Sequence, residues 1–317
     1  MEIIEKAAIF GAAGAIGPHV AAEFEKRGTR FRVVGRSRER LQRAFGGMAH
    51  AEMFEADVSD PTSAAAASEG IDTIIYTVGV PYTSFQLHPQ MMRTIVEAAA
   101  AKSVSRLVLV SSVYSYGVPR TSRVAETHPR QPESRKGQYR KEQEDIALSA
   151  NEGGRIHSLV VRLPDFYGPG ADLSLANPIF RAAVAGTTAN WIGPVNAKHE
   201  FFYAPDAGPA IVDLASCARC YGEAWNLGGA GEINTLDFIT RIYRAAGRPP
   251  KYRTAGRSLL KMMGWFKPFY AELPEMLYLS ETPVILDDTK LVSRLGNVRK
   301  TSYDEGIRQT LDWMRTH

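Results

Sequence analysis

The 317-residue sequence predicts an α/β protein built on a doubly wound parallel sheet, and two observations lead to this prediction. In the first half of the chain, short β-branched runs alternate with amphipathic stretches, which is typical of βαβ units. Runs such as Thr73–Tyr76 and Leu107–Val110 are apolar on both faces, as strands covered by helices on each side must be. The expected strands are Lys6–Phe10, Phe31–Val34, Ala51–Glu55, Thr73–Thr77, Arg106–Ser111 and Ile156–Leu163. The expected helices are Ile16–Arg27, Arg38–Ala44, Pro61–Ser68, Pro89–Lys102 and Gln138–Asn151.

Composition excludes several classes of protein. Hydrophobic residues make up 44% and charged residues 23% of the chain, which is ordinary globular usage and argues against fibres and disorder. The net charge of +4 is spread along the chain, so no nucleic-acid partner is expected. No apolar run approaches the ~20 residues of a membrane span, and the first residues lack a basic leader, so we expect no membrane partner and a cytoplasmic location.

Two cysteines, Cys217 and Cys220, have CxxC spacing but no second pair and no nearby histidine. Metal sites and redox motifs of this type need such companions. We therefore expect structural cysteines in a reducing compartment, and no metal site.

The strand Lys6–Phe10 runs directly into a glycine-rich turn with the spacing GxxGxxG, followed by a helix. Glycines at such a turn allow a tight reversal and a close approach of the backbone to a pyrophosphate, while the helix N-terminus supplies N–H groups. A purely structural glycine turn is the alternative reading. The strand before and the helix after favour a dinucleotide site formed by Gly11, Gly14, Ala15, Ile16 and Gly17.

The end of the second expected strand carries Arg36 and Arg38 instead of an acidic residue. An Asp or Glu there would bind the ribose of NAD, whereas a guanidinium forms charge-assisted hydrogen bonds with a 2′-phosphate. The sequence therefore favours NADP(H) over NAD(H). The alternative is that both arginines simply begin a solvated helix.

The glycine-rich turn and several further motifs together resemble those of the extended (atypical) short-chain dehydrogenase/reductase family. The members that the chain most resembles are the NAD(P)-dependent epimerases and dehydratases. The motifs are Glu55–Asp60, Thr77–Gly79, Val110–Gly117, Val161–Pro169 and the C-terminal segments from Asp288 to Trp313. The resemblance implies a Rossmann-type fold with a smaller C-terminal substrate lobe, and a catalytic serine at Ser112. It also implies cofactor contacts from Asp57, Val58, Thr77, Val78, Gly79, Ser111 and Pro164. Asp165 replaces the asparagine that the family carries beside the nicotinamide.

The catalytic helix departs from the family pattern Tyr-x-x-x-Lys. If Tyr139 is the tyrosine, the lysine position holds Gln143, and if Lys141 is the lysine, the tyrosine position holds Gly137. The spacing from Ser112 is nearer the second register. Tyr139 and Lys141 remain candidates, with Lys136 as a possible surrogate acid. Because a phenol of pKa ~10 is a poor base at neutral pH, carbonyl reduction is favoured over alcohol oxidation.

Three functions are compatible with these residues. The first is an NADP(H)-dependent oxidoreductase that reduces a small, largely apolar substrate. The second is an NADP(H) sensor without turnover, as proposed for NmrA-like relatives, which the incomplete dyad favours. The third is a nucleotide-sugar epimerase or dehydratase, but His199 stands where that branch places a phosphate-binding arginine, so diphosphate affinity should be weak unless Lys198 compensates. Arg257, where a second such arginine might be sought, leads into a Met- and aromatic-rich stretch better suited to an apolar pocket.

The expected domain boundaries follow from the motifs. Residues 1–168 are assigned to the NADP(H)-binding domain, with 206–229 returning to it, and residues 169–205 and 230–317 to the substrate lobe. The Met- and aromatic-rich stretch Leu259–Leu279 is either core or an apolar substrate wall. The family often dimerises through the helices expected at Pro89–Lys102 and Gln138–Asn151, so a homodimer is possible by analogy.

Overall fold

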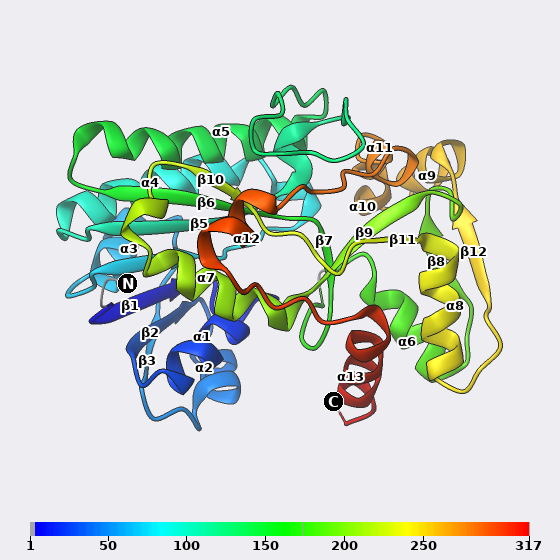
Figure 1. The fold of residues 1–317 in the computed structure, drawn as a ribbon, viewed down its shortest axis with the longest axis horizontal. Helices are drawn as coiled ribbons and strands as arrows, with labels where there is room; N and C mark the ends of the chain where they lie inside the picture. The colour runs from blue at the N-terminus through cyan, green and yellow to red at the C-terminus, as the bar shows by residue number, and fades with distance from the viewer. Residues whose placement is uncertain (1–3, 173, 317) are drawn as a thin grey trace.

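The computed structural model describes residues 4–172 and 174–316. Its main sheet has seven parallel strands in the order β10-β6-β5-β4-β1-β2-β3 (Figure 1). The strands are β1 (Lys6–Phe10), β2 (Arg30–Gly35), β3 (Ala51–Glu55), β4 (Thr73–Tyr76), β5 (Arg106–Ser112), β6 (His157–Leu163) and β10 (Ala224–Asn226). The predicted doubly wound sheet is confirmed. Strand β10, from the segment expected to return, pairs with β6.

Helices cover both faces of this sheet, because alternate residues of each strand are apolar on opposite sides. Val108 packs in one core and Leu107 in the other. One face is covered by α1 (Gly17–Lys26), α2 (Arg38–Phe45), α7 (Ala207–Ala215) and α12 (Thr289–Leu295). The other is covered by α3 (Pro61–Ala67), α4 (Leu87–Ala101) and α5 (Arg135–Ser149).

Side-chain caps explain where several of these helices begin. Ser37 accepts a hydrogen bond from the backbone N–H of Arg40 at the start of α2, and Asp60 does the same for Thr62 in α3. Ser134 caps α5 by accepting from the N–H of Gly137 at 3.1 Å. These residue types are the preferred N-caps because their oxygens satisfy otherwise unpaired helix N–H groups.

The smaller lobe lies beside the carboxyl ends of the main strands (Figure 1). It has a three-stranded sheet of β11 (Glu232–Asn234), β9 (Lys198–Tyr203) and β7 (Asp165–Tyr167), and a pair of strands, β12 (Tyr252–Ala255) and β8 (Ala189–Ile192). Its helices include α6 (Asn177–Ala185), α8 (Thr235–Ala245) and α13 (Tyr303–Thr316). Stacked rings form its core, with Phe201 and Phe238 only 4.3 Å apart between ring centroids. Three short helices complete it: α9 (Arg257–Gly264), α10 (Pro268–Ala271) and α11 (Tyr278–Glu281).

The cysteines differ from expectation, because Cys217 and Cys220 form a disulfide. The short 3₁₀ turn Ala218–Cys220 brings their Cα atoms to 5.3 Å, which is within the range that a disulfide spans. Within residues 4–172 and 174–316, no helix is long and apolar enough to cross a bilayer. The same residues contain no cluster of three or more side chains able to hold a metal ion.

Candidate dinucleotide and substrate site

The glycine-rich loop follows β1 at the point where the sheet order reverses between β1 and β4. Gly11 has φ of +79°, and a Cβ there would lie 2.8 Å from the backbone of Val78. A Cβ at Gly17 would lie 2.2 Å from the carbonyl oxygen of Ala12. Only glycine therefore permits this turn, which ends at Ile16, the residue before the first turn of α1. The crevice outside such a reversal is where open α/β sheets bind ligands.

The end of β4 holds this loop in place. Thr77 donates its hydroxyl to the carbonyl oxygens of Phe10 at 2.9 Å and Gly11 at 3.2 Å. Val78 and Gly79 continue from Thr77 along the crevice, with the backbone of Val78 against Gly11. The glycine loop is therefore preformed, and its backbone fits a pyrophosphate without a side chain in the way.

Both predicted arginines lie exposed at the end of β2. In the part of the chain that the structure describes, neither Arg36 nor Arg38 forms a side-chain ion pair, so both guanidinium groups are available to an anion. Asp57, after β3, accepts hydrogen bonds from Ser59, and these together with the charge of Arg36 lower the pKa of the Asp57 carboxyl. Val58 beside it is buried. The geometry thus gathers Arg36 and Asp57 at one edge of the crevice.

The end of β5 is organised by a buried network around Glu144 of α5. This carboxylate accepts from the Ser111 hydroxyl at 2.6 Å, and from Arg162 Nε and Nη2 at 3.0 and 2.8 Å. Arg162 in turn donates to the hydroxyl of Tyr116. Burial raises the pKa of the Glu144 carboxyl, but the charge and hydrogen bonds of Arg162 outweigh burial and hold that pKa below its ordinary value. The hydroxyl of Ser111, predicted to contact the cofactor, is occupied in this network.

Ser112, the next residue, differs from Ser111 in its hydrogen bonding. Its Oγ is buried and has no hydrogen-bond partner in the described structure. An unpaired buried hydroxyl costs about 1–3 kcal/mol, so such atoms in native structures call for an explanation. A substrate oxygen bound at this position would satisfy it.

The two other predicted catalytic residues do not join Ser112 through any contact of the described residues. Tyr139 is partly exposed and packs against the aromatic cluster around Phe85 and Tyr114. Lys141 forms an ion pair with Asp145 one turn along α5, at 2.7 Å. At Gly137 a Cβ would lie 2.7 Å from the carbonyl oxygen of Tyr114, so no tyrosine fits the second register.

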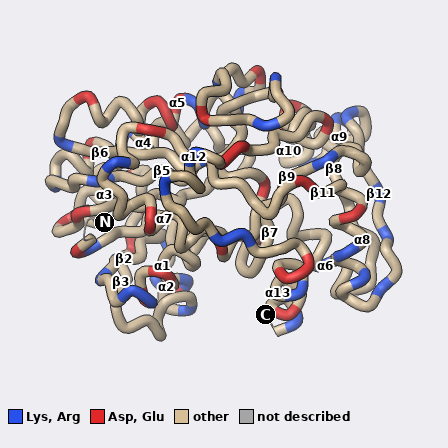
Figure 2. Tube along the Cα trace, in the orientation of Figure 1, with Lys and Arg blue, Asp and Glu red and all other residues tan. Residues whose placement is uncertain are grey.

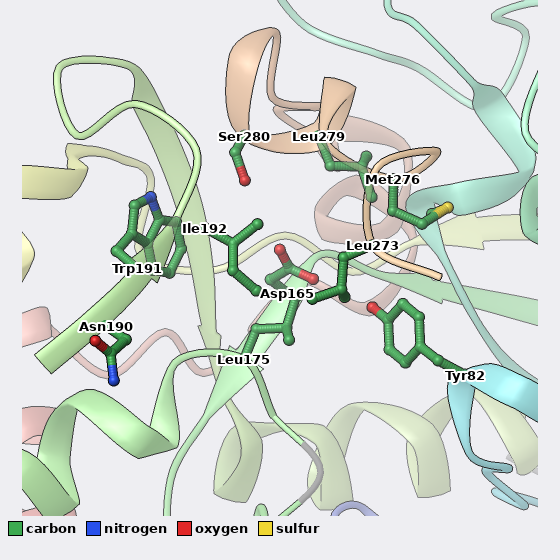
Figure 3. Close-up of a pocket in the computed structure, with 10 residues that line it drawn as sticks. All are labelled: Tyr82, Asp165, Leu175, Asn190, Trp191, Ile192, Leu273, Met276, Leu279 and Ser280. Atoms are coloured by element: carbon green, nitrogen blue, oxygen red, sulfur yellow. The ribbon is translucent and has the colours of Figure 1, made fainter. Parts of the chain in front are cut away.

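A cavity lies between the two lobes, just beyond the ends of β4 and β6 (Figure 3). Its volume is about 30 Å³, room for only a few water molecules, so a larger substrate must displace side chains to enter. The ten lining residues are mostly apolar and include no lysine or arginine. They are Tyr82, Asp165, Leu175, Asn190, Trp191, Ile192, Leu273, Met276, Leu279 and Ser280.

Tyr82, which lines this cavity, belongs to a pair of tyrosines that the sequence did not reveal. The hydroxyls of Tyr82 and Tyr114 lie 2.6 Å apart and share a hydrogen bond. Burial, and next the negative charge of Asp165, raise the pKa of the Tyr82 phenol. Figure 3 shows the Tyr82 hydroxyl and the Asp165 carboxylate turned toward the same space. Tyr114 lay within a quoted motif, but Tyr82 had no sequence signal, because the pair is made only by tertiary packing.

Each of the cationic candidates is paired with a carboxylate. Lys136 is buried and held by Glu272 and Glu275, so two carboxylates balance its charge. His199 Nε2 lies 3.1 Å from Asp165 Oδ2, while Lys198 is paired with Glu232. Arg257 is exposed and pairs with Glu281 at 3.5 Å. None of these four side chains lines the cavity.

The parallel sheet, the preformed glycine loop at its switch point and the second lobe over the strand ends define a Rossmann-type dinucleotide-binding protein. The model of the NAD dependent epimerase/dehydratase family matches residues 7–228, and the chain belongs to this family. The resemblance to extended short-chain dehydrogenases/reductases drawn from the motifs is confirmed.

Individual relatives share limited sequence identity with the chain, and over only part of its length. The chain is 31% identical to 2'-dehydrokanamycin reductase of Streptomyces kanamyceticus over 154 residues, 47% of this chain and 44% of the relative. It is 26% identical to dTDP-6-deoxy-L-talose 4-dehydrogenase (NAD(P)(+)) of Kitasatospora kifunensis over 211 residues, 62% and 66% of the two chains. The chain thus spans about half to two thirds of these curated relatives. Both relatives are oxidoreductases by name.

A solved structure shares the fold across the whole chain. DesIV, a dTDP-glucose 4,6-dehydratase from Streptomyces venezuelae with NAD and TYD bound, matches with a TM-score of 0.83 and 18% identity, over 98% of this chain and 97% of that one. At this identity the likeness establishes the fold.

Proposed function

We propose that this protein is an NADP(H)-dependent oxidoreductase that reduces the carbonyl group of a small, largely apolar substrate in the cavity between its lobes. The lining of that cavity carries the proposal. Six of its ten residues are Leu, Ile, Met or Trp, and no cation is present to hold a diphosphate. The names of the two curated relatives concern sugar-derived compounds. The cavity of this chain lacks the charged groups that a nucleotide sugar needs.

The proposed cofactor contacts follow the crevice. The bound dinucleotide would supply the hydride. The loop of Gly11, Gly14, Ala15, Ile16 and Gly17 would hold the pyrophosphate, and Arg36 and Arg38 the 2′-phosphate. Asp57 and Val58 would contact the adenosine, and the segments after β4, β5 and β6 would border the nicotinamide.

Two side chains of the protein would act on the substrate oxygen. Ser112 would orient it through the otherwise unpaired Oγ. For the proton we favour Tyr82 over the originally predicted Tyr139, because Tyr82 lines the cavity and Tyr139 does not. A nascent alkoxide is a stronger base than a phenolate, so it accepts a proton even from a phenol whose pKa is raised. The hydroxyl of Tyr114, 2.6 Å away, can then hydrogen-bond the phenolate.

A raised phenol pKa also makes Tyr82 better suited to act as an acid than as a base. Oxidation of an alcohol needs a base, and burial beside Asp165 disfavours the phenolate form of Tyr82. Reduction needs only an acid and is therefore the favoured direction.

A cofactor-dependent sensor without turnover is the second candidate. The small cavity and the occluded Gly137 position favour it. Steady consumption of NADPH with a panel of ketones and aldehydes would establish the reductase. NADPH binding without consumption across the panel would leave the sensor as the better proposal.

We expect NADP(H) to bind more tightly than NAD(H), and Arg36→Asp to lower NADPH affinity at least about tenfold, because a carboxylate repels the 2′-phosphate that a guanidinium binds. Titration calorimetry with both cofactors measures this. Arg40→Asp, an exposed change in the helix α2 that follows Arg36, is the matched control and should leave the preference intact. Equal affinity of the unmodified protein for both cofactors would contradict the expectation.

The substrate class is tested by binding in the presence of NADP⁺, so that no turnover is required. We expect small apolar ketones or alcohols to raise the Tm, and UDP- or dTDP-sugars to have no effect, because no cation lines the cavity. A Tm shift with the nucleotide sugars alone would contradict the apolar-substrate proposal and favour a nucleotide-sugar epimerase or dehydratase.

A further inference from the structure

The segment from Lys251 to Ala271 presents an unusual surface. It contains five basic residues, Lys251, Arg253, Arg257, Lys261 and Lys267, and no acidic residue. It comprises β12, α9 and α10 at one end of the smaller lobe (Figure 1). Figure 2 shows Lys and Arg along α9 and β12.

Large apolar side chains of the same segment point into solvent. Trp265 is 84% exposed and Phe266 82% exposed, and Leu259, Met262 and Phe269 are also exposed. Together with the five basic residues we call these side chains the basic-apolar surface. Monomeric proteins rarely expose such a patch unless it contacts a partner or a membrane.

The same segment is nevertheless firmly attached to the fold. Leu260 is fully buried against Leu273 and Leu277, and the ring of Phe269 packs on Tyr82 with 6.1 Å between centroids. Because Tyr82 lines the cavity, the basic-apolar surface adjoins the candidate substrate site. The exposed rings are therefore displayed by an ordered framework.

Charge determines which occupant fits. Among the described contacts, four of the five cations, Lys251, Arg253, Lys261 and Lys267, have no carboxylate partner, and only Arg257 has one. A two-fold dimer through this surface would place it against itself and oppose like charges. An anionic bilayer instead offers negative headgroups to the lysines and arginines, and an interfacial layer that Trp and Phe prefer.

We propose that the basic-apolar surface binds the surface of an anionic lipid bilayer, with Trp265 and Phe266 inserted at the headgroup level. The expectation of no membrane partner rested on the absence of a spanning run, and a surface contact needs no such run. The proposal does not depend on turnover or on cofactor.

Vesicle flotation tests the proposal. We expect the full chain to float with vesicles of phosphatidylcholine and phosphatidylglycerol, and to stay behind with phosphatidylcholine alone. Trp191 and Trp225 are buried, and Trp313 lies on α13, outside the basic-apolar surface. A blue shift of tryptophan emission on binding should therefore come mainly from Trp265 and be lost in Trp265→Phe. Bound protein should be released as salt rises, because headgroup attraction is screened.

Two variants separate the contributions. Trp265→Ser with Phe266→Ser removes the apolar anchor, and Lys261→Glu with Lys267→Glu reverses two charges and should reduce partitioning at least about tenfold. Arg155→Glu with Arg219→Glu, exposed and distant in sequence, is the charge-matched control and should partition normally. All are surface changes, so an unaltered Tm checks folding. No flotation with either vesicle would overturn the proposal. Concentration-dependent dimerisation abolished by Trp265→Ser with Phe266→Ser, without flotation, would overturn it in favour of a second copy.

Discussion

Glu144→Ala is expected to lower the free energy of unfolding by about 3 to 5 kcal/mol, the usual cost of leaving a buried charge unpaired. Glu144 is fully buried, and its removal would strand the guanidinium of Arg162, itself only 2% exposed. It would also free the hydroxyls of Ser111 and Ser115. Urea denaturation followed by circular dichroism measures the change.

Glu142→Ala on the same helix is the matched control. Its carboxylate pairs with Arg93, but both side chains are about half exposed, so the loss should stay below about 1 kcal/mol. The pKa of the Glu144 carboxyl is lowered in the folded protein, so its contribution to stability is present above the unfolded pKa and declines as pH falls through the folded pKa. Equal destabilisation by the two variants would show that the buried network around Glu144 contributes no more to the free energy of unfolding than the exposed pair of Glu142 and Arg93.

Tyr82→Phe is expected to lower the rate of carbonyl reduction about a hundredfold, because it removes the proposed proton donor and keeps the ring that packs on Phe269. Ser112→Ala should lower the rate at least about tenfold, since the substrate oxygen would lose its orienting hydroxyl. Single-turnover kinetics with NADPH and the best ketone of the panel measure both.

Tyr139→Phe is the comparison for this series, and we expect it to retain most of the activity. If Tyr139→Phe abolishes reduction while Tyr82→Phe leaves it intact, the proton donor lies on α5 as the family pattern suggests. An unchanged Tm in each variant separates chemistry from stability.

The main sheet could be predicted because its signals are local. The doubly apolar run Thr73–Tyr76 and the glycines after β1 carry their own structural meaning, and the structure reproduces them. The smaller lobe could not be predicted in detail, since its strands are short and pair across long intervals, as β7 does with β9. Their registers depend on packing that no window of sequence contains.

The residues of the candidate site likewise fall into those that the sequence predicts and those that only the tertiary structure brings together. Arg36 was predicted from its position at a strand end and Ser112 from the family resemblance, whereas the Tyr82–Tyr114 pair arises only when two turns after different strands meet. The Leu259–Leu279 stretch was assigned as either core or pocket wall. In the structure Leu273, Met276 and Leu279 line the cavity, while Trp265 and Phe266 face solvent, a third outcome that neither prediction included.

The close contact at Gly137 limits how this protein could be re-engineered. A Gly137→Tyr substitution would complete the Tyr-x-x-x-Lys motif with Lys141. Judged from the sequence alone, it is the obvious substitution to try. The new Cβ would collide with Tyr114 and with Pro132, whose own Cβ would lie 2.5 Å away. Lys141 would still be turned toward Asp145. Reinstating the dyad in this register therefore requires rebuilding the turn after β5 and the approach to α5 together, so a substitution at Gly137 alone does not restore it.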